Sequence, residues 1–191
     1  MRFLTHLLLM FAVALAVGFG LSWYALSDGR LFGAYRVGPW AAWPAAGSPT
    51  PDPYTRAHIA RTGALQLGQS EGLEFVASTD SQGRPLDRAC TYRVHGTTPV
   101  ASFWTLVAEA QDGTNIARSE GEEALHSARL VRNEDGTAVI FVGKRLSPLN
   151  WLEITGEGPF SLALTLYDTA AFGGVGSGAD TLPAIDREDC A

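Results

Sequence analysis

The sequence is poor in cysteine and has none of the cysteine spacings that build a zinc site. Its 191 residues contain two cysteines, Cys90 and Cys190, and neither belongs to a CxxC pair or a Cys/His cluster. A structural zinc site needs about four such ligands and is therefore not expected. In an exported domain the two thiols are expected to form a disulfide. The alternative is two separate buried thiols.

Catalytic motifs are absent as well. The sequence contains no GxSxG, HExxH or P-loop pattern, so the commonest hydrolase and nucleotide-binding sites are not indicated. The GxGxG spacing from Gly174 to Gly178 does not follow a strand of a βαβ unit and is interpreted as a loop. We expect no metal and no cofactor, because the histidines are far apart in the sequence: His6, His58, His95 and His126.

Basic residues are in deficit, and the formal net charge is −6 at pH 7. This balance disfavours nucleic acid as a partner, because phosphates favour a basic face. It also disfavours docking on anionic lipid by charge alone. The length allows one ordinary domain with attachments.

Acidic residues are missing from the N-terminal end. Up to Ser27 the only charged residue is Arg2, and the run from Leu7 to Leu26 is uncharged. A helix of about 20 apolar residues spans a bilayer, whereas the apolar core of a cleaved signal peptide has roughly 7–15 residues. The sequence therefore predicts an uncleaved signal-anchor over residues 1–27, with residues 7–26 in the membrane.

The charges that flank this span do not decide its orientation, because Arg2 precedes it and Arg30 and Arg36 follow it. The short N-terminal tail and the cysteine pair favour a C-terminal domain outside the cytoplasm. Self-association through the span is a further hypothesis, since three small residues have helix-packing spacing: Ala12, Ala16 and Gly20.

Residues 28–52 are expected to form a tether, because frequent prolines disfavour a regular helix or a central strand. Trp40 and Trp43 lie in this segment. We expect them to pack on the domain or to lie at the membrane interface, and a ligand-gripping aromatic pair is the alternative.

Residues 53–191 are expected to form the domain. It begins with a helix from Pro53 to Leu67, which Asp52 caps and Gly68 ends. After Gly72 the apolar period changes to two, which predicts strands. The fold class is therefore mainly β, an antiparallel, jelly-roll-like β-sandwich with one leading α-helix, preceded by a single transmembrane helix.

The predicted strands differ in character. The segment from Phe103 to Ala108 is apolar on both faces, which is typical of a central strand covered on both sides. A short helix is expected from Ser119 to His126, and Phe172 to Asp180 is expected to be a flexible loop that lets Cys190 fold back. The expected strands cover residues 74–79, 90–95, 103–108, 130–132, 137–142 and 160–167.

A candidate ligand pocket combines aromatic walls with a few polar groups. Both tryptophans of this set also suit the core, and the asparagine suits a backbone contact across a turn. An alternative hypothesis is a hydrolase-type enzyme in which carboxylates and the histidine converge near one of the tryptophans. The candidate residues are His95, Trp104, Asn150, Trp151 and Tyr167.

Three segments resemble a known family. FWTL at 103–106, NWLE at 150–153 and GPFSLALTLYD at 158–168 are similar in order and spacing to the family called domain of unknown function 1214. The resemblance covers roughly Gly72 to Pro183. It implies a β-sandwich-like domain of bacterial origin and implies no activity. Glu153 replaces a proline common in longer members, and Thr165 replaces an arginine, which weighs against an anion-binding role for that position.

The sequence and the resemblance together suggest a single-pass protein of the bacterial inner membrane with a periplasmic C-terminal domain. Because catalytic motifs are absent, we expect a non-catalytic binding or interaction module. Its partner would be an envelope protein or an envelope ligand, and not nucleic acid.

Overall fold

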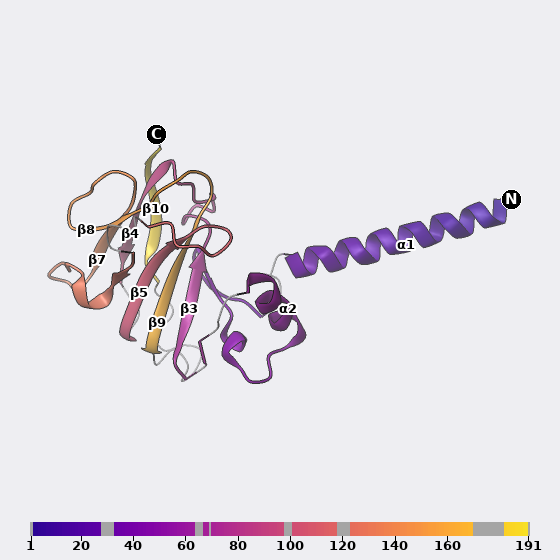
Figure 1. The fold of residues 1–191 in the computed structure, drawn as a ribbon, viewed down its shortest axis with the longest axis horizontal. Helices are drawn as coiled ribbons and strands as arrows, with labels where there is room; N and C mark the ends of the chain where they lie inside the picture. Colours follow the sequence, from indigo (N-terminus) through magenta and orange to yellow (C-terminus); the bar gives the residue numbers. More distant parts are fainter. Residues whose placement is uncertain are drawn as a thin grey trace.

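The computed structural model describes residues 2–27, 33–63, 67–68, 70–97, 101–117, 123–169 and 182–190. Within them, a long N-terminal helix precedes a domain that is mainly β (Figure 1). The helices are α1 (Arg2–Ser27) and α2 (Pro53–Thr62), with 3-10 turns η1 (Pro44–Gly47) and η2 (Ser127–Arg129). The strands are β1 (Tyr35–Val37), β2 (Trp40–Ala42), β3 (Gly72–Ala77), β4 (Cys90–Gly96), β5 (Ala101–Glu109), β6 (Leu125–His126), β7 (Ala138–Gly143), β8 (Asn150–Glu153), β9 (Ser161–Thr169) and β10 (Ala184–Cys190).

Helix α1 projects from the domain and is not packed into the core (Figure 1). Its 23-residue stretch Arg2–Tyr24 contains an 18-residue window with a mean hydropathy of 2.2, and none of that window is buried within the protein. This length and composition suffice to cross a bilayer. Near its end, the guanidinium carbon of Arg61 lies 5.2 Å from the ring centre of Trp23 and links α1 to α2.

Helix α2 begins where the sequence predicts. Asp52 caps it by accepting hydrogen bonds from the backbone N–H groups of Tyr54 (2.9 Å) and Thr55 (3.1 Å), and Pro53 stands at the first position. The helix ends earlier than expected, at Thr62, because Gly63 adopts the left-handed conformation with φ 63°.

Two sheets form the domain. The six-stranded sheet has the order β1-β2-β3-β9-β5-β6, and the four-stranded sheet has the order β10-β4-β7-β8. The mainly β prediction is confirmed, but the expectation of purely antiparallel pairing is wrong for one pair, since β7 and β8 run parallel. The loop 144–149 returns the chain to the start of β7, so that Asn150 pairs with Ile140.

One hydrophobic core includes residues from both sheets. Strand β5 contributes only one of its faces, with Trp104, Leu106 and Ala108 inside, while Phe103 is 37% exposed. The expectation that β5 is covered on both faces is therefore wrong. A small apolar cavity of about 10 Å³ remains where residues of the two sheets meet, beside Trp104 and Ile140.

Part of the segment 28–52, which was expected to be a tether, forms strands. Strands β1 and β2 extend the six-stranded sheet through pairing of β2 with β3. Trp40 is fully buried, and its Nε1–H donates a 2.7 Å hydrogen bond to the carbonyl of Pro183. Trp43 stacks on His58 with ring centres 4.0 Å apart. The packing interpretation of both tryptophans is thus confirmed.

Other local predictions differ from the structure. Residues 125–126 form a strand and not the end of a helix, and residues 130–132 form no strand. Strand β10 was not expected. The expected helix start at Ser119 and the expected loop from Phe172 to Asp180 lie outside the described residues.

Candidate functional site

The five residues predicted to form a pocket lie in three separate environments. Trp104 is 2% exposed in the core. Asn150 is also buried; its Oδ1 accepts from the N–H of Val131 (2.8 Å), and its Nδ2 donates to the carbonyls of Val131 (2.8 Å) and Val139 (2.9 Å). Both side chains therefore have structural roles, as their alternative interpretation proposed.

His95 and Trp151 share the outward face of the four-stranded sheet. Nε2 of His95 lies 2.7 Å from Oδ2 of Asp186 on β10. Arg93 lies 3.6 Å from the same carboxylate and 2.8 Å from that of Glu188. These contacts form a ladder of charges that joins β4 to β10. Trp151 lies on β8, two strands away, and its Nε1–H donates to the carbonyl of Gly143 (3.1 Å).

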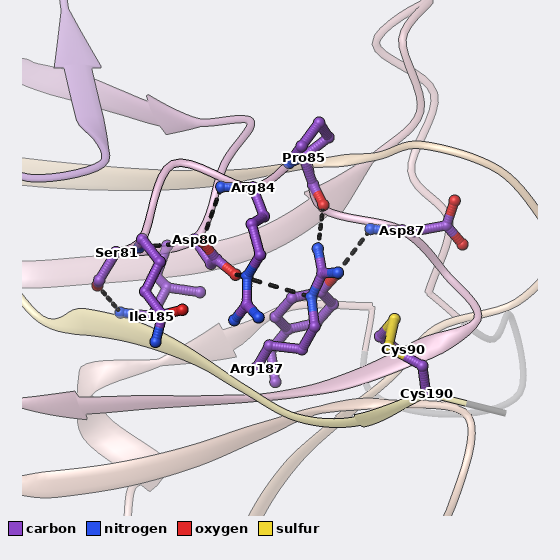
Figure 2. A network of polar contacts seen from close by, with 11 residues as sticks. Asp80, Ser81, Arg84, Pro85, Asp87, Cys90, Ile185, Arg187 and Cys190 are labelled. Carbon is purple, nitrogen blue, oxygen red and sulfur yellow. Dashed lines mark hydrogen bonds and ion pairs between the residues drawn. A yellow bond between two sulfur atoms is a disulfide. The ribbon is translucent and has the colours of Figure 1, made fainter.

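A buried aspartate holds the C-terminal strand from the other side (Figure 2). The Asp80 side chain has no exposed surface. Its Oδ1 accepts from the backbone N–H groups of Gln82 (3.0 Å) and Arg84 (2.9 Å), and its Oδ2 accepts from Nε of Arg84 (2.7 Å). Burial raises the pKa of Asp80, but these hydrogen bonds outweigh it and leave the pKa below its usual range.

The same turn contacts β10 directly. Ser81 and Ile185 form two hydrogen bonds of 2.8 Å each: the backbone N–H of Ser81 donates to the carbonyl of Ile185, and the N–H of Ile185 donates to the side-chain Oγ of Ser81. Arg187 lies 3.7 Å from Asp80, donates to the carbonyl of Pro85, and covers the ring of Tyr92 at 5.5 Å (Figure 2). We call the Asp80 turn together with these β10 contacts the C-terminal clasp.

A disulfide closes the far end of β10. Cys90 begins β4, Cys190 ends β10, and the two are direct partners in the register. The predicted bridge is therefore present. A hollow of about 400 Å³ lies beside it. Its lining carries three acidic and three basic side chains, so neither sign of charge dominates: Asp87, Arg88, Lys144, Arg145, Glu157 and Asp189.

Tyr167 lies on a third surface, the outward side of the six-stranded sheet. Its ring centre is 5.9 Å from that of Phe103, which in turn is 5.5 Å from that of His126. Strand alternation places these rings opposite the core-facing Trp104. We call this surface the outer sheet face; it consists of Gly72, Glu74 and Val76 of β3, Ser161, Ala163, Thr165 and Tyr167 of β9, Phe103, Thr105, Val107 and Glu109 of β5, and His126 of β6.

Two carboxylates on the outer sheet face are perturbed. Burial raises the pKa of Glu74, and a hydrogen bond with Thr165 lowers it only in part. Burial also raises the pKa of Glu109, and the charge of Glu74 raises it further. A cation lies on the same outward side at the edge of the sheet, since Arg36 of β1 is opposite Ala41 of β2, which pairs with Val76. A face that combines aromatic rings with carboxylates of raised pKa is a candidate binding surface.

Sequence reasoning identified Tyr167 but missed Phe103, His126, Glu74 and Glu109. The available signal was strand alternation, which places Phe103, Thr105, Val107 and Glu109 on one side of β5. Cross-strand register then adds the remaining members, and the sequence does not reveal that register. Among the described residues, no three histidine, cysteine, aspartate or glutamate side chains gather as a metal site.

Comparisons with known proteins give a fold and a family. No curated protein matches the chain. The VPA0106 protein from Vibrio parahaemolyticus has a similar structure, with a TM-score of 0.57 and 19% identity over 71% of this chain and 35% of that chain. An uncharacterized protein from Burkholderia cenocepacia gives a TM-score of 0.48 and 15% identity over 93% of this chain and 52% of that one. The chain thus spans about a third and about half of the lengths of these proteins.

The three segments that resemble a family lie on β5, on β8 and around β9. Residues 71–171 match the family described as "Protein of unknown function (DUF1214)". This match covers more than half of the chain, and the protein belongs to the DUF1214 family.

Proposed function

We propose that this protein is a membrane-anchored binding module of the bacterial envelope, with its β domain on the periplasmic side of the inner membrane. The observation that carries the proposal is α1, an apolar helix that finds no burial within the protein. Burying a large apolar side chain contributes about 1.5–3 kcal/mol relative to water. A bilayer provides that burial along the whole helix.

The disulfide supports the orientation. Bridges such as Cys90–Cys190 form and persist outside the cytoplasm, whereas cytoplasmic thiols are kept reduced. A periplasmic domain on a short connection from α1 presents its sheets to envelope components. The outer sheet face, with its aromatic rings and carboxylates, is the surface best suited to bind one of them.

Thiol labelling of the full chain tests the location. Cells with a permeabilised outer membrane are treated with a membrane-impermeant maleimide, with or without reductant. We expect labelling of Cys90 and Cys190 only after reduction, with the inner membrane intact. The Cys90→Ser/Cys190→Ser variant gives the background. Labelling that needs no reductant but requires opening of the inner membrane would place the domain in the cytoplasm.

Membrane fractionation tests the anchor separately. The full chain is expected to stay in the membrane pellet after alkaline extraction, because a spanning helix is not released by disrupting polar contacts. A variant lacking residues 2–27 is expected in the soluble fraction. Release of the full chain by alkali would contradict a membrane-spanning role for α1.

A hydrolase that uses His95 is the second candidate, favoured by the 2.7 Å contact between His95 and Asp186. The surroundings support a stabilising role instead, because Arg93 shares the same carboxylate. In a stabilising role, His95→Gln lowers the melting temperature. A catalytic base would instead allow replacement without a stability change.

A further inference from the structure

We propose that α2 lies on the membrane surface beside α1, where Arg56 and Arg61 bind the phosphates of anionic phospholipid headgroups. The inference rests on the membrane-spanning role proposed for α1. It does not depend on which side of the membrane carries the domain, or on what the β domain binds.

The contact between the two helices determines the depth of α2. Residues 7–26 of α1 extend about 30 Å at 1.5 Å per residue, which matches the hydrocarbon core of a bilayer. Trp23 therefore lies near the boundary between hydrocarbon and headgroups, where tryptophan is enriched in membrane proteins. The guanidinium carbon of Arg61 is 5.2 Å from the centre of the Trp23 ring. Arg61 accordingly lies at the level of the headgroups, and α2 lies beside the domain end of α1 (Figure 1).

The surface of α2 suits this position. Thr55 is fully buried, so its side of the helix faces the domain. Tyr54, Ala57 and Arg61 recur at helical spacing along another side, and this side contacts α1 through Arg61. Tyr54 is 46% exposed, and tyrosine, like tryptophan, is enriched at membrane interfaces. The side of α2 that contacts α1 therefore faces the bilayer surface.

The uneven charge of the chain gives α2 an anionic partner. Residues 33–63 carry three arginines and one aspartate, whereas residues 64–191 carry nine basic and 18 acidic residues. The aspartate is Asp52, which caps α2, and both Arg56 and Arg61 are exposed. An anionic surface attracts this basic segment and repels the acidic remainder. The net charge of the whole chain does not bring the protein to the bilayer, but once α1 is inserted the arginines orient the domain.

Arginine is also the side chain best suited to a phosphate. Its planar guanidinium donates two parallel hydrogen bonds to phosphate oxygens. Nε of Arg56 donates to the carbonyl of Pro51 at 2.9 Å, which orients the group. This bond uses one of the five N–H donors of the guanidinium, and the two terminal nitrogens carry the others.

Spin labels on the full chain in nanodiscs of POPC and POPG test the position of α2. Both native cysteines are in the disulfide, so a label attaches only to an introduced cysteine. We expect the label of Ala57→Cys to be shielded from a water-soluble nickel complex. Ala60→Cys, at an exposed position of α2, repeats the measurement if the first label disturbs the helix. The control is Leu146→Cys, at a position 81% exposed between β7 and β8, strands that lie far from α1 in Figure 1. Its label is expected to be fully accessible.

Lipid charge and arginine charge are then varied separately. Replacing POPG with POPC is expected to lower the ratio of shielded to accessible label at position 57. Arg56→Gln is expected to lower this ratio about fivefold in the presence of POPG, as removal of one basic residue near an anionic membrane does. Arg56→Lys keeps the charge and should retain most of the shielding. Arg145→Gln removes an arginine whose side chain is 72% exposed between β7 and β8, and should change nothing.

Other results would overturn the proposal. An accessible label at both positions of α2 would place the helix away from the membrane. Equal shielding with and without POPG would mean that the contact with Trp23, and not lipid phosphate, positions α2. A loss in Arg56→Lys as large as that in Arg56→Gln would mean that the bond to Pro51 is what matters.

A label in α1 separates this inference from the anchor itself. The label of Val13→Cys, in the middle of the predicted span, should be reached by oxygen and not by the nickel complex, whatever the result for α2. An accessible α2 with a shielded Val13 label would overturn only the headgroup proposal. A Val13 label that the nickel complex reaches would contradict the membrane-spanning role of α1.

Discussion

Burial raises the pKa of carboxylates in both the C-terminal clasp and the outer sheet face, but the net shifts are opposite. Asp80 has no exposed side-chain surface, yet its pKa is lowered, because donors from Gln82 and Arg84 outweigh the desolvation. Glu109 is only half-buried, yet its pKa is raised, by burial first and by the charge of Glu74 second. The number of donors around a carboxylate, and not its depth alone, decides the direction.

The difference separates a stabilising region from the proposed binding region. The clasp surrounds the Asp80 carboxylate with hydrogen-bond donors, and its contacts hold β10 against the turn at residues 80–85. The carboxylates of the outer sheet face have fewer donors, with Thr165 bonded to Glu74, so their ionisation lowers the stability of the folded protein. Such a trade between stability and function is common at binding sites.

Asp80→Ala is expected to have the largest effect. It leaves two turn N–H groups and Nε of Arg84 without their acceptor, and breaking a buried charged contact costs about 3 kcal/mol or more. Chemical denaturation at pH 7 measures the loss. Because the folded pKa is below the ordinary 3.8, the Asp80 contribution is present above that value and is lost as pH falls through the folded pKa.

Asp135→Ala is the matched control. Asp135 accepts from the N–H (2.9 Å) and the hydroxyl (2.6 Å) of Thr137 in an exposed turn. Its loss is expected to be far smaller, because water replaces the missing acceptor. Equal losses at the two positions would show that the burial of Asp80 is unimportant.

Cys90→Ser is expected to have the next largest effect. Removing the bridge frees a loop of 100 residues in the unfolded chain, for which chain entropy gives at most about 4.7 kcal/mol and typical losses are about 2–4 kcal/mol. In reductant, the wild-type protein should have the same melting temperature as the variant. Cys190→Ser should give the same loss of stability as Cys90→Ser. An unchanged melting temperature would mean that the clasp alone fixes β10.

The comparison also shows what the sequence could reveal. The apolar alternation of Cys90, Tyr92 and Val94 predicts a strand with one buried face, and that face is buried. Strand β10, with the sequence AIDREDC, carries four charged residues and gave no such signal. Its stability comes from tertiary partners instead, including Arg93, His95 and Asp80.

The candidate site could not be predicted from the sequence for a related reason. Glu74 and Glu109 are 35 positions apart and look like ordinary surface residues of two strands. Only the insertion of β9 between β3 and β5 places them on one face. Likewise, the prolines near Trp40 led to the prediction of a tether and not of β1 and β2. Sheet pairing overrides this weak local preference.

Glu109→Gln is expected to have the smallest effect, with the opposite sign. Ionisation of a carboxyl whose folded pKa is raised destabilises the protein, so stability is lost as pH rises through that pKa. The variant should be more stable than wild type at pH 7, by less than about 1 kcal/mol, and equal to it below the ordinary pKa of 4.5. In a Glu74→Gln background the gain should shrink, because Glu74 contributes part of the shift. A variant less stable than wild type at pH 7 would mean that hydrogen-bond donors stabilise the ionised carboxylate of Glu109, as they do that of Asp80. The outer sheet face and the clasp would then not differ in how they stabilise their carboxylates.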